Sequence, residues 1–512
     1  MSLQKNIGTW GMLFAAAGGM VGSGWLFGPF YVAQFAGPAA IMSWVIGGLL
    51  MVVVAMTFAE LSSTFPMAGG TIRFLHLSHG PLVSFTMAWI GWLSSVAVAP
   101  IETMALLQYA SNYMPWLMKT VSGAKVLSNA GMAAAAFLMM LMVMVNIFGV
   151  KLLSKANIAV VSIKIAIPLL TMLVLFITDF HVTNITGSEF SPMGWKGVLA
   201  ALPAAGVIFS FIGYSPAIQL AGEAKNPQRS VPIAIIGALI ICISLYVLLQ
   251  IAFLGALTPE SYAHGWQNLS FKNDAGPFVG LASGIGLMWL SKILYIDAAI
   301  SPFGTGLIYT ASTARLGYAI KENGYLPKPL HPLNKFGVPG RVIWLNYFVG
   351  LLLFLPFPSW QKLVSFLVSA LVFTYAVGPL SLLVLRRAMP NQHRPFKVPM
   401  AQLLCIVAFY ICNLIIFWSG WDIISKILIT LLLGYLALLF YRKTEVGRKI
   451  NFGWQRAWWI FVYIITLGVI SYLGSFGGGI GLLPFGWDFL VIAIASYLIF
   501  KLSYYCAFSS LN

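Results

Sequence analysis

The chain has 512 residues, of which 60% are hydrophobic and 8% are charged, and its formal net charge is +17. Soluble domains carry roughly a quarter charged residues, so this composition excludes a water-soluble enzyme, and high hydrophobicity with four cysteines excludes a disordered or disulfide-stapled protein. Apolar runs near twenty residues long predict an all-α integral membrane protein, since a β-barrel would show short alternating segments.

Fourteen apolar runs, bounded by charged residues, proline or glycine, are candidate transmembrane helices. They cover residues 8–36, 40–65, 81–113, 128–149, 154–178, 197–222, 231–256, 279–318, 341–358, 360–386, 400–419, 421–441, 456–475 and 486–507. No cleavage-site pattern separates the first run from the rest, so we expect it to be a retained span.

The basic residues predict the orientation of these spans. With the N-terminus placed in the cytoplasm, 21 of the 29 Lys and Arg residues fall in cytoplasmic segments and five fall outside. This asymmetry is the positive-inside pattern of membrane proteins. We therefore expect a multi-pass protein of the cell (inner) membrane with both termini cytoplasmic, and no nucleic-acid partner.

Two spans carry helix-breaking residues near their middle. The first contains GGMVGSG at 18–24, and the sixth contains Gly213 and Pro216. Unwound backbone persists in a bilayer only where it lines an enclosed cavity, and corresponding broken helices in two halves indicate an inverted-repeat transporter. Close helix packing at small residues is the alternative, but it does not account for a proline in mid-span.

Four segments resemble those of the amino acid–polyamine–organocation (APC) superfamily of permeases. They are GGMVGSG at 18–24, AELSSTFPMAGG at 59–70, EAKNPQRSVP at 223–232, and the stretch 314–339 with its ARL, NGYLP, HP and GVP elements. They follow the family's order, and GSGWLFGP at 22–29 is most similar to bacterial permeases of the aspartate–proton symporter type.

The resemblance implies a five-plus-five inverted repeat with broken helices 1 and 6 and a substrate site between them. Residues 1–386 would form this core, from spans 1–5 and 6–10, and residues 387–512 would add four C-terminal transmembrane helices.

The substrate site is predicted to have two halves lined by backbone groups. Free N–H groups at the start of the second half of helix 1 would hold a carboxylate, and freed carbonyls at the helix 6 break would accept from an ammonium group. The first half consists of Val21, Gly22, Ser23 and Gly24. The second consists of Phe209, Ser210 and Ile212, with Tyr214 and Phe211 as candidates for side-chain contact, gating or core packing.

Charged residues inside spans are expected to have a partner or a function, because each costs about 2.5–3.5 kcal/mol on insertion scales. Lys164 lies near the middle of span five. Related proton-coupled permeases carry a lysine at a comparable point, so the resemblance implies that Lys164 couples proton movement to transport. The alternative is a static lysine bonded to helix 1 carbonyl groups.

Three further charges lie in spans three and eight. Glu102 and Lys292 are expected to form an interhelical pair, with Lys292 contacting an acidic substrate side chain as the second interpretation. Asp297 lies five residues after Lys292, about 140° around a helix, so it would face helix 1 or Lys164. Either Glu102 or Asp297 is a candidate carrier of the coupled proton.

At the cytoplasmic ends of spans two and six lie Glu60 and Glu223. Arg73 and Arg229 are their expected partners in an inner gate, and ordinary interface positions are the alternative.

These features predict secondary active transport of an amino acid, as proton-coupled uptake, with aspartate or glutamate favoured. Exchange of neutral or cationic amino acids, with Glu102 reading the cation, is the alternative. A membrane nutrient sensor or an intramembrane transferase belongs to a different class, although the twelve acidic residues are too scattered for the latter. No cofactor or metal is expected, because no metal-ligand spacing occurs.

Overall fold

The structure is a computed structural model. It describes residues 7–67, 70–121, 124–148, 150–187, 190–271, 276–322, 324–325, 334, 338–448, 450 and 452–511.

Helices make up most of the described chain. The N-terminal half contains α1 (Thr9–Met20), α2 (Ser23–Ala36), α3 (Ala40–Thr64), α4 (Gly70–His79), α5 (Pro81–Ala110), α6 (Asn129–Phe148), α7 (Val150–Thr178), α8 (Thr183–Thr186), α9 (Gly194–Ala204), α10 (Val207–Phe211), α11 (Ser215–Gln219) and α12 (Pro227–Gly255). The rest contains α13 (Pro277–Gly284), α14 (Met288–Glu322), α15 (Gly340–Leu353), α16 (Trp360–Tyr375), α17 (Val377–Ala388), α18 (Ala401–Trp418), α19 (Trp421–Tyr441), α20 (Glu445–Arg448), α21 (Trp454–Ala457), α22 (Trp459–Leu473) and α23 (Trp487–Leu511). In the described residues the strands are β1 (Met118–Val121) and β2 (Ala124–Leu127), paired antiparallel.

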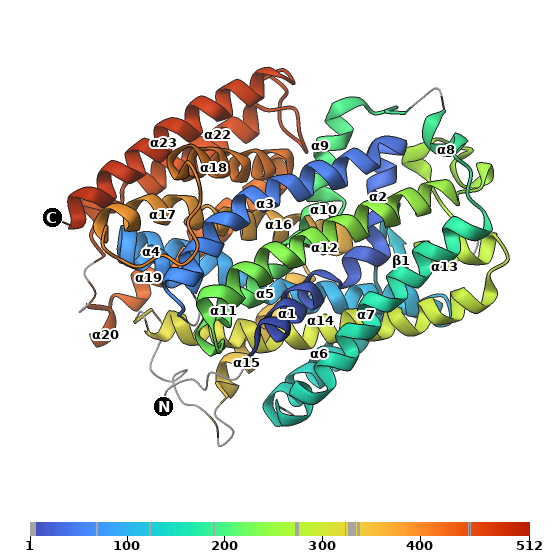
Figure 1. Cartoon of the computed structure of the whole chain (residues 1–512), viewed down its shortest axis with the longest axis horizontal. Coiled ribbons are helices and arrows are strands. Elements are labelled where there is room, and N and C mark those ends of the chain that lie inside the picture. Colours follow the sequence, from blue (N-terminus) through green and yellow to red (C-terminus); the bar gives the residue numbers. More distant parts are fainter. Residues whose placement is uncertain are drawn as a thin grey trace.

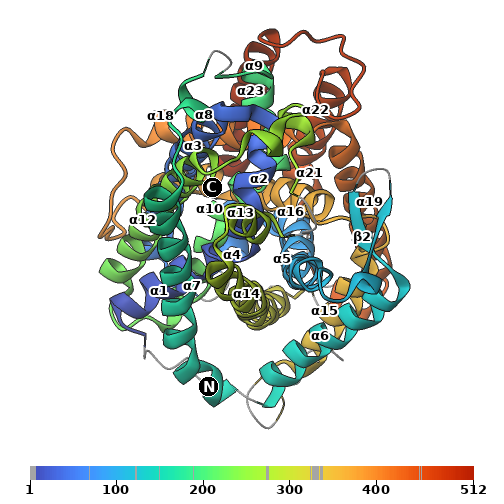
Figure 2. The same cartoon turned by 90° about the vertical axis from the view of Figure 1, so that its right-hand side faces the viewer.

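The long helices run side by side along the long axis of the molecule (Figures 1 and 2). The C-terminal end of α23, the short helix α20 and α4 lie at one end, and β1, α8 and α13 lie at the other (Figure 1). This arrangement is that of a bundle whose connections gather at two opposite ends, as a bilayer requires.

In the centre of the bundle α5 packs against both α14 and α16, and α12 packs against both α3 and α1. Burial follows the same division. The most apolar window of α5 is 89% buried and that of α16–α17 is 94% buried, whereas those of α7, α19 and α23 are 33% buried. The latter helices therefore carry the outward-facing apolar surface that lipid would cover.

Ten described helices are long and apolar enough to cross a membrane, or eleven if one bent pair counts as a span; the sequence predicted fourteen. The range 8–36 is divided, and its second part continues through a 3-10 turn into α3 as one helical stretch, Ser23–Thr64. The range 197–222 is the bent pair, α15 has only 14 residues, and α14 does not pass the same test.

Both predicted interruptions are present. Helix α1 ends at Met20 and α2 begins at Ser23, with Val21 and Gly22 between them in non-helical conformations. In the sixth range the chain bends by 50° between Ala204 and Val207.

The sixth interruption differs in position from the prediction. The bend lies at Gly206, whose φ of +93° is a left-handed conformation that glycine adopts without steric cost. Gly213, the expected break, lies in a 3-10 turn (Ile212–Tyr214) between α10 and α11. The helix is therefore loosened over several residues rather than broken at one.

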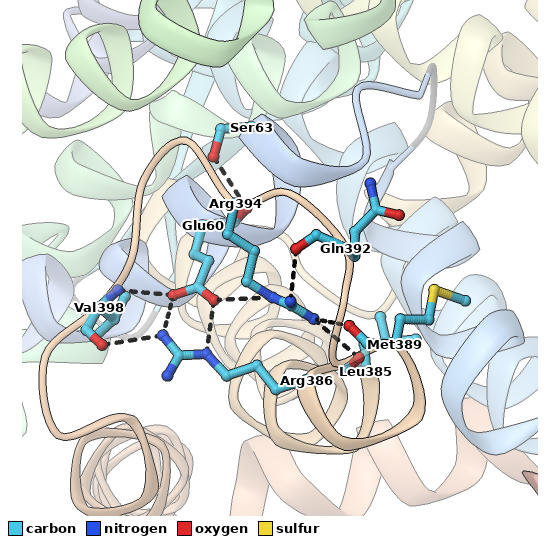
Figure 3. Close-up of polar contacts among 8 residues, drawn as sticks. All are labelled: Glu60, Ser63, Leu385, Arg386, Met389, Gln392, Arg394 and Val398. Atoms are coloured by element: carbon cyan, nitrogen blue, oxygen red, sulfur yellow. Dashed lines mark hydrogen bonds and ion pairs between the residues drawn. The ribbon is translucent and has the colours of Figure 1, made fainter.

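Glu60, at the end of α3, is fully buried and binds two arginines (Figure 3). Arg386 forms a bidentate pair with it, from Nε to Oε1 at 2.7 Å and from Nη2 to Oε2 at 2.5 Å. Arg394 Nε lies 3.7 Å from Oε1, and the Val398 N–H donates to Oε2 at 2.7 Å. The carboxylate thus fastens α3 to the end of α17 and the segment that follows it.

The ion-pair partners of Glu60 and Glu223 differ from those expected. Glu60 binds Arg386 and Arg394 rather than Arg73, and Glu223 pairs with Arg315 at 3.5 Å rather than with Arg229. Sequence proximity suggested the expected partners, whereas the fold brings residues more than 300 positions apart to Glu60.

Replacing Glu60 by Gln should destabilise the fold by about 3–5 kcal/mol, because the guanidinium of Arg394, only 5% exposed, loses its buried counter-ion. Thermal unfolding of the purified protein in detergent measures the change. Glu223→Gln is the control, with an expected loss of about 1 kcal/mol or less, since Arg315 is 43% exposed. Equal effects of the two variants would contradict the assigned role of Glu60.

Candidate functional site

The two interruptions lie against each other. A Cβ placed on Gly19 would lie 2.6 Å from the Gly213 carbonyl oxygen, and one placed on Gly213 would overlap the backbone of Gly19 and Met20. Both positions therefore require glycine, because the obstructing atoms are backbone atoms that cannot rotate away. This close approach positions the loosened parts of the first and sixth spans around one point.

Side chains satisfy the carbonyl groups at the end of α1. Lys164 Nζ, on α7, donates to the Gly18 carbonyl oxygen at 2.7 Å, and the Tyr246 hydroxyl, on α12, donates to the Met20 carbonyl oxygen at 2.9 Å. The hydrogen bond that the static alternative for Lys164 requires, to a helix 1 carbonyl group, is thus present.

Ser23 opens α2 and is held from two sides. Its backbone N–H donates to Glu102 Oε2 at 2.9 Å, and the indole N–H of Trp360 donates to its hydroxyl oxygen at 3.1 Å. The other oxygen of Glu102, Oε1, is buried and has no hydrogen-bond partner among the residues that the structure describes. A Cβ on Gly22 would lie 2.6 Å from that oxygen, which places Oε1 beside the unwound segment.

Lys164 is the centre of a buried charge cluster. It is 0% exposed, and its Nζ also donates to the Thr305 hydroxyl at 2.5 Å. Glu102 and Asp297 are also 0% exposed, and Glu102 borders the same cavity as Thr305. Lys164 is thus linked through Thr305 to the cavity that contains the buried Glu102.

Asp297 binds the first span as expected. Its Oδ2 accepts from the indole N–H of Trp25 at 3.1 Å, and its Oδ1 accepts from the Ser301 hydroxyl at 2.7 Å. Asp297 therefore links α14 to α2.

A small cavity lies between the two interrupted spans, beside Glu102 and Thr305. It is lined by Gly19, Met20, Gly22, Val98, Glu102, Phe209, Ile212, Thr305 and Tyr309. Both interrupted spans contribute to the lining, and Glu102 is its acidic member.

Of the predicted backbone-site residues, Gly22, Phe209 and Ile212 line this cavity, and Val21, Ser23, Gly24 and Ser210 do not. Val21 is buried in the unwound segment, and a Cβ on Gly24 would overlap the Ser210 hydroxyl, so α2 and α10 are in direct contact. Ser210 donates its hydroxyl to the Gly206 carbonyl oxygen at 2.9 Å, which caps the bend. The Ile212 carbonyl oxygen accepts from the Tyr375 hydroxyl at 2.9 Å.

Tyr214 lies outside the residues that line the cavity. Its ring stacks on that of Tyr375 at a centroid distance of 5.3 Å, and it is fully buried. This environment corresponds to the core-packing interpretation of Tyr214.

The expected pair between Glu102 and Lys292 is not formed. Glu102 is fully buried, whereas Lys292 is on the exposed face of α14. The rotation of about 140° between positions 292 and 297 explains the difference, because α14 directs Asp297 inward and so directs Lys292 outward. Glu102 instead accepts from the Ser23 N–H.

Thr305 and Tyr309 were missed from the sequence, although a signal for them exists. Asp297, Ser301, Thr305 and Tyr309 recur every four residues, so they share one face of α14. A polar stripe of this kind on a span predicts an inward-facing surface.

Comparison with known proteins identifies the family. Residues 7–438 match the amino acid permease family. The chain belongs to this family. This permease is 37% identical over 507 residues to the glutamate/serine transporter AimA of Bacillus subtilis, covering 97% of this chain and 93% of the relative. It is 32% identical over 502 residues to the aspartate–proton symporter of the same organism, covering 98% and 96%.

The comparison also fixes the class of this permease. It is 28% identical over 424 residues to the methylthioribose transporter of Bacillus subtilis, covering 80% of this chain and 87% of the relative. The relatives are transporters and permeases, so this chain is a multi-pass membrane transporter rather than an enzyme.

Gly213→Ala should reduce transport at least tenfold, because the added Cβ overlaps the backbone of Gly19 and Met20 and separates the two interrupted spans. Counterflow of a radiolabelled amino acid into liposomes measures the loss. Gly284→Ala is the control, since nothing lies within 4 Å of its added Cβ. Transport by Gly213→Ala at the level of the control would contradict the requirement for close approach.

Proposed function

We propose that this permease is a secondary active transporter that couples uptake of an acidic amino acid, aspartate or glutamate, to proton entry. The observation that carries the proposal is the buried ammonium group of Lys164, bonded to the interrupted helix 1 and to Thr305, which borders the same cavity as Glu102. The similarity to the aspartate–proton symporter and the glutamate/serine transporter supports both the coupling and the substrate class.

Substrate recognition is proposed to use backbone groups of the two interrupted spans. The N–H groups of Ser23 and Gly24 stand at the N-terminus of α2, where the helix dipole favours a carboxylate. Those of Val21 and Gly22 already donate to the Ala17 and Met20 carbonyl oxygens. The carbonyl groups of Phe209, Ser210 and Ile212 would accept from the ammonium group. All α-amino acids share these two groups, so side-chain selectivity has to come from the other lining residues.

Proton coupling is assigned to Lys164 and Asp297. Lys164 holds the carbonyl group of Gly18, and Asp297 holds the indole of Trp25, so both ionisable groups bind the first span on either side of its break. A change of charge on either group alters the strength of a bond to a moving helix, which is how a proton would bias the conformation.

The topology is proposed to be that of a five-plus-five inverted repeat with fourteen spans. The stretch Ser23–Thr64 has 42 residues, about 63 Å of helix at 1.5 Å per residue, which is twice the thickness of a hydrocarbon core. It therefore has to cross twice. Residues 1–386 would form the core and residues 387–512 four further spans, with both termini in the cytoplasm of a cell whose inner membrane holds the protein.

Exchange of neutral amino acids is the second candidate. Apart from Glu102, the residues that line the cavity are uncharged. One relative, AimA, is a glutamate/serine transporter, and serine is a neutral amino acid. A cationic substrate would instead use Glu102. A sensor or an intramembrane transferase would not exchange its ligand across a bilayer.

Counterflow in liposomes tests the proposed function. Liposomes that contain the purified protein are loaded with unlabelled L-aspartate, L-glutamate, L-serine or L-lysine. They should take up the matching labelled amino acid, most rapidly when it is aspartate or glutamate. An inward proton gradient should then drive accumulation of L-aspartate. If L-serine exchanges faster than L-aspartate and its exchange does not depend on the proton gradient, the protein is a neutral amino acid exchanger. If no amino acid exchanges, the protein is not an amino acid transporter.

Lys164→Gln should reduce proton-driven accumulation at least tenfold while leaving measurable counterflow, because the amide cannot carry the exchanged proton. Measuring uptake with and without a pH gradient distinguishes accumulation from counterflow. Lys501→Gln, which removes an exposed lysine from α23, is the matched control. Full accumulation by Lys164→Gln would exclude Lys164 from coupling.

A further inference from the structure

A carboxylate of the protein itself occupies the predicted carboxylate site. The Ser23 N–H, at the N-terminus of α2, donates to Glu102 Oε2 at 2.9 Å, and both residues are 0% exposed. A helix N-terminus binds any carboxylate by the same N–H groups and dipole. Glu102, from α5, therefore makes the contact that a substrate carboxylate would make.

We propose that Glu102 is an internal competitor of the substrate, bound at Ser23 until the substrate carboxylate displaces it. The inference rests on the proposed function, since it assumes that the substrate carboxylate binds at this helix terminus. Gly22 and Glu102 line the same small cavity as Phe209 and Ile212, so the competitor and the two backbone-lined halves border one space.

The unpartnered oxygen of Glu102 indicates the direction of displacement. Oε1 is buried without a described hydrogen-bond partner, a costly state for a carboxylate oxygen. A Cβ built on Gly22 would lie 2.6 Å from Glu102 Oε1 and 3.0 Å from the Thr305 hydroxyl oxygen. Glu102 Oε1 and the Thr305 hydroxyl therefore border the same space beside Gly22. Thr305 in turn accepts from Lys164 at 2.5 Å.

A displaced Glu102 therefore turns toward Thr305 and Lys164. There it meets the Thr305 hydroxyl and the ammonium group that donates to that hydroxyl. The exchange replaces one carboxyl group by another at Ser23 and moves the Glu102 side chain toward the lysine assigned to coupling. Substrate occupancy and the charge environment of Lys164 are thereby linked through one side chain.

Equilibrium binding of radiolabelled L-aspartate and L-serine to the purified full-length protein tests the inference. Glu102→Gln keeps the size of the side chain and an acceptor for Ser23, but its neutral hydrogen bond is about half as strong. Affinity for the transported amino acid should rise about tenfold in this variant. Asp488→Asn, which changes a buried carboxylate on α23, should leave affinity unchanged. Weaker or unchanged binding by Glu102→Gln would overturn the inference.

Infrared difference spectra of the wild-type protein provide a second measurement that does not depend on folding of Glu102→Gln. Addition of ¹³C-carboxyl L-aspartate should change a protein carboxylate band, and that band should shift in Glu102→Asp. A spectrum without any protein carboxylate change would contradict displacement. Wild-type protein that exchanges amino acids but fails these tests rejects only the inference, whereas wild-type protein that neither binds nor exchanges any amino acid rejects the proposed function with it.

Discussion

Backbone polar groups inside a bilayer have no water to bind, so an interrupted helix persists only if the protein supplies every missing partner. The gap between α1 and α2 is the place where this requirement is strongest. Lys164 and Tyr246 donate to carbonyl groups on one side of it, and Glu102 accepts from the Ser23 N–H on the other. Most of the charged and hydroxyl-bearing side chains of the site are explained by this one need.

The same partners give the site its chemistry. An ammonium group is a strong donor to a free carbonyl group, and a carboxylate is a strong acceptor from a free N–H group. Supplying partners to both sides of the helix break therefore places a lysine and a glutamate in one buried region. Each charge then lowers the cost of burying the other. The structural requirement and the capacity to respond to a proton or a charged substrate therefore reside in the same bonds.

Several elements of the site follow from sequence because they depend on local properties. Glycine at 18–24 and the proline at 216 weaken a helix whatever surrounds it, and Lys164 in mid-span needs an internal partner whatever that partner is. The stripe from Asp297 to Tyr309 was equally readable. The bend at Gly206 was not, since its left-handed backbone and its close approach to the Trp360 ring are features of the tertiary structure.

The sequence by itself determined the membrane class, the approximate spans, the two interrupted helices and the residues whose charge demands a partner, because hydropathy and helix propensity act over short stretches of chain. Only the tertiary structure decided the pairings. Glu60 meets Arg386 across more than 300 residues, and Glu102 meets Ser23 rather than Lys292. Such pairings depend on how whole helices rotate and cross, which the packing of the complete bundle sets.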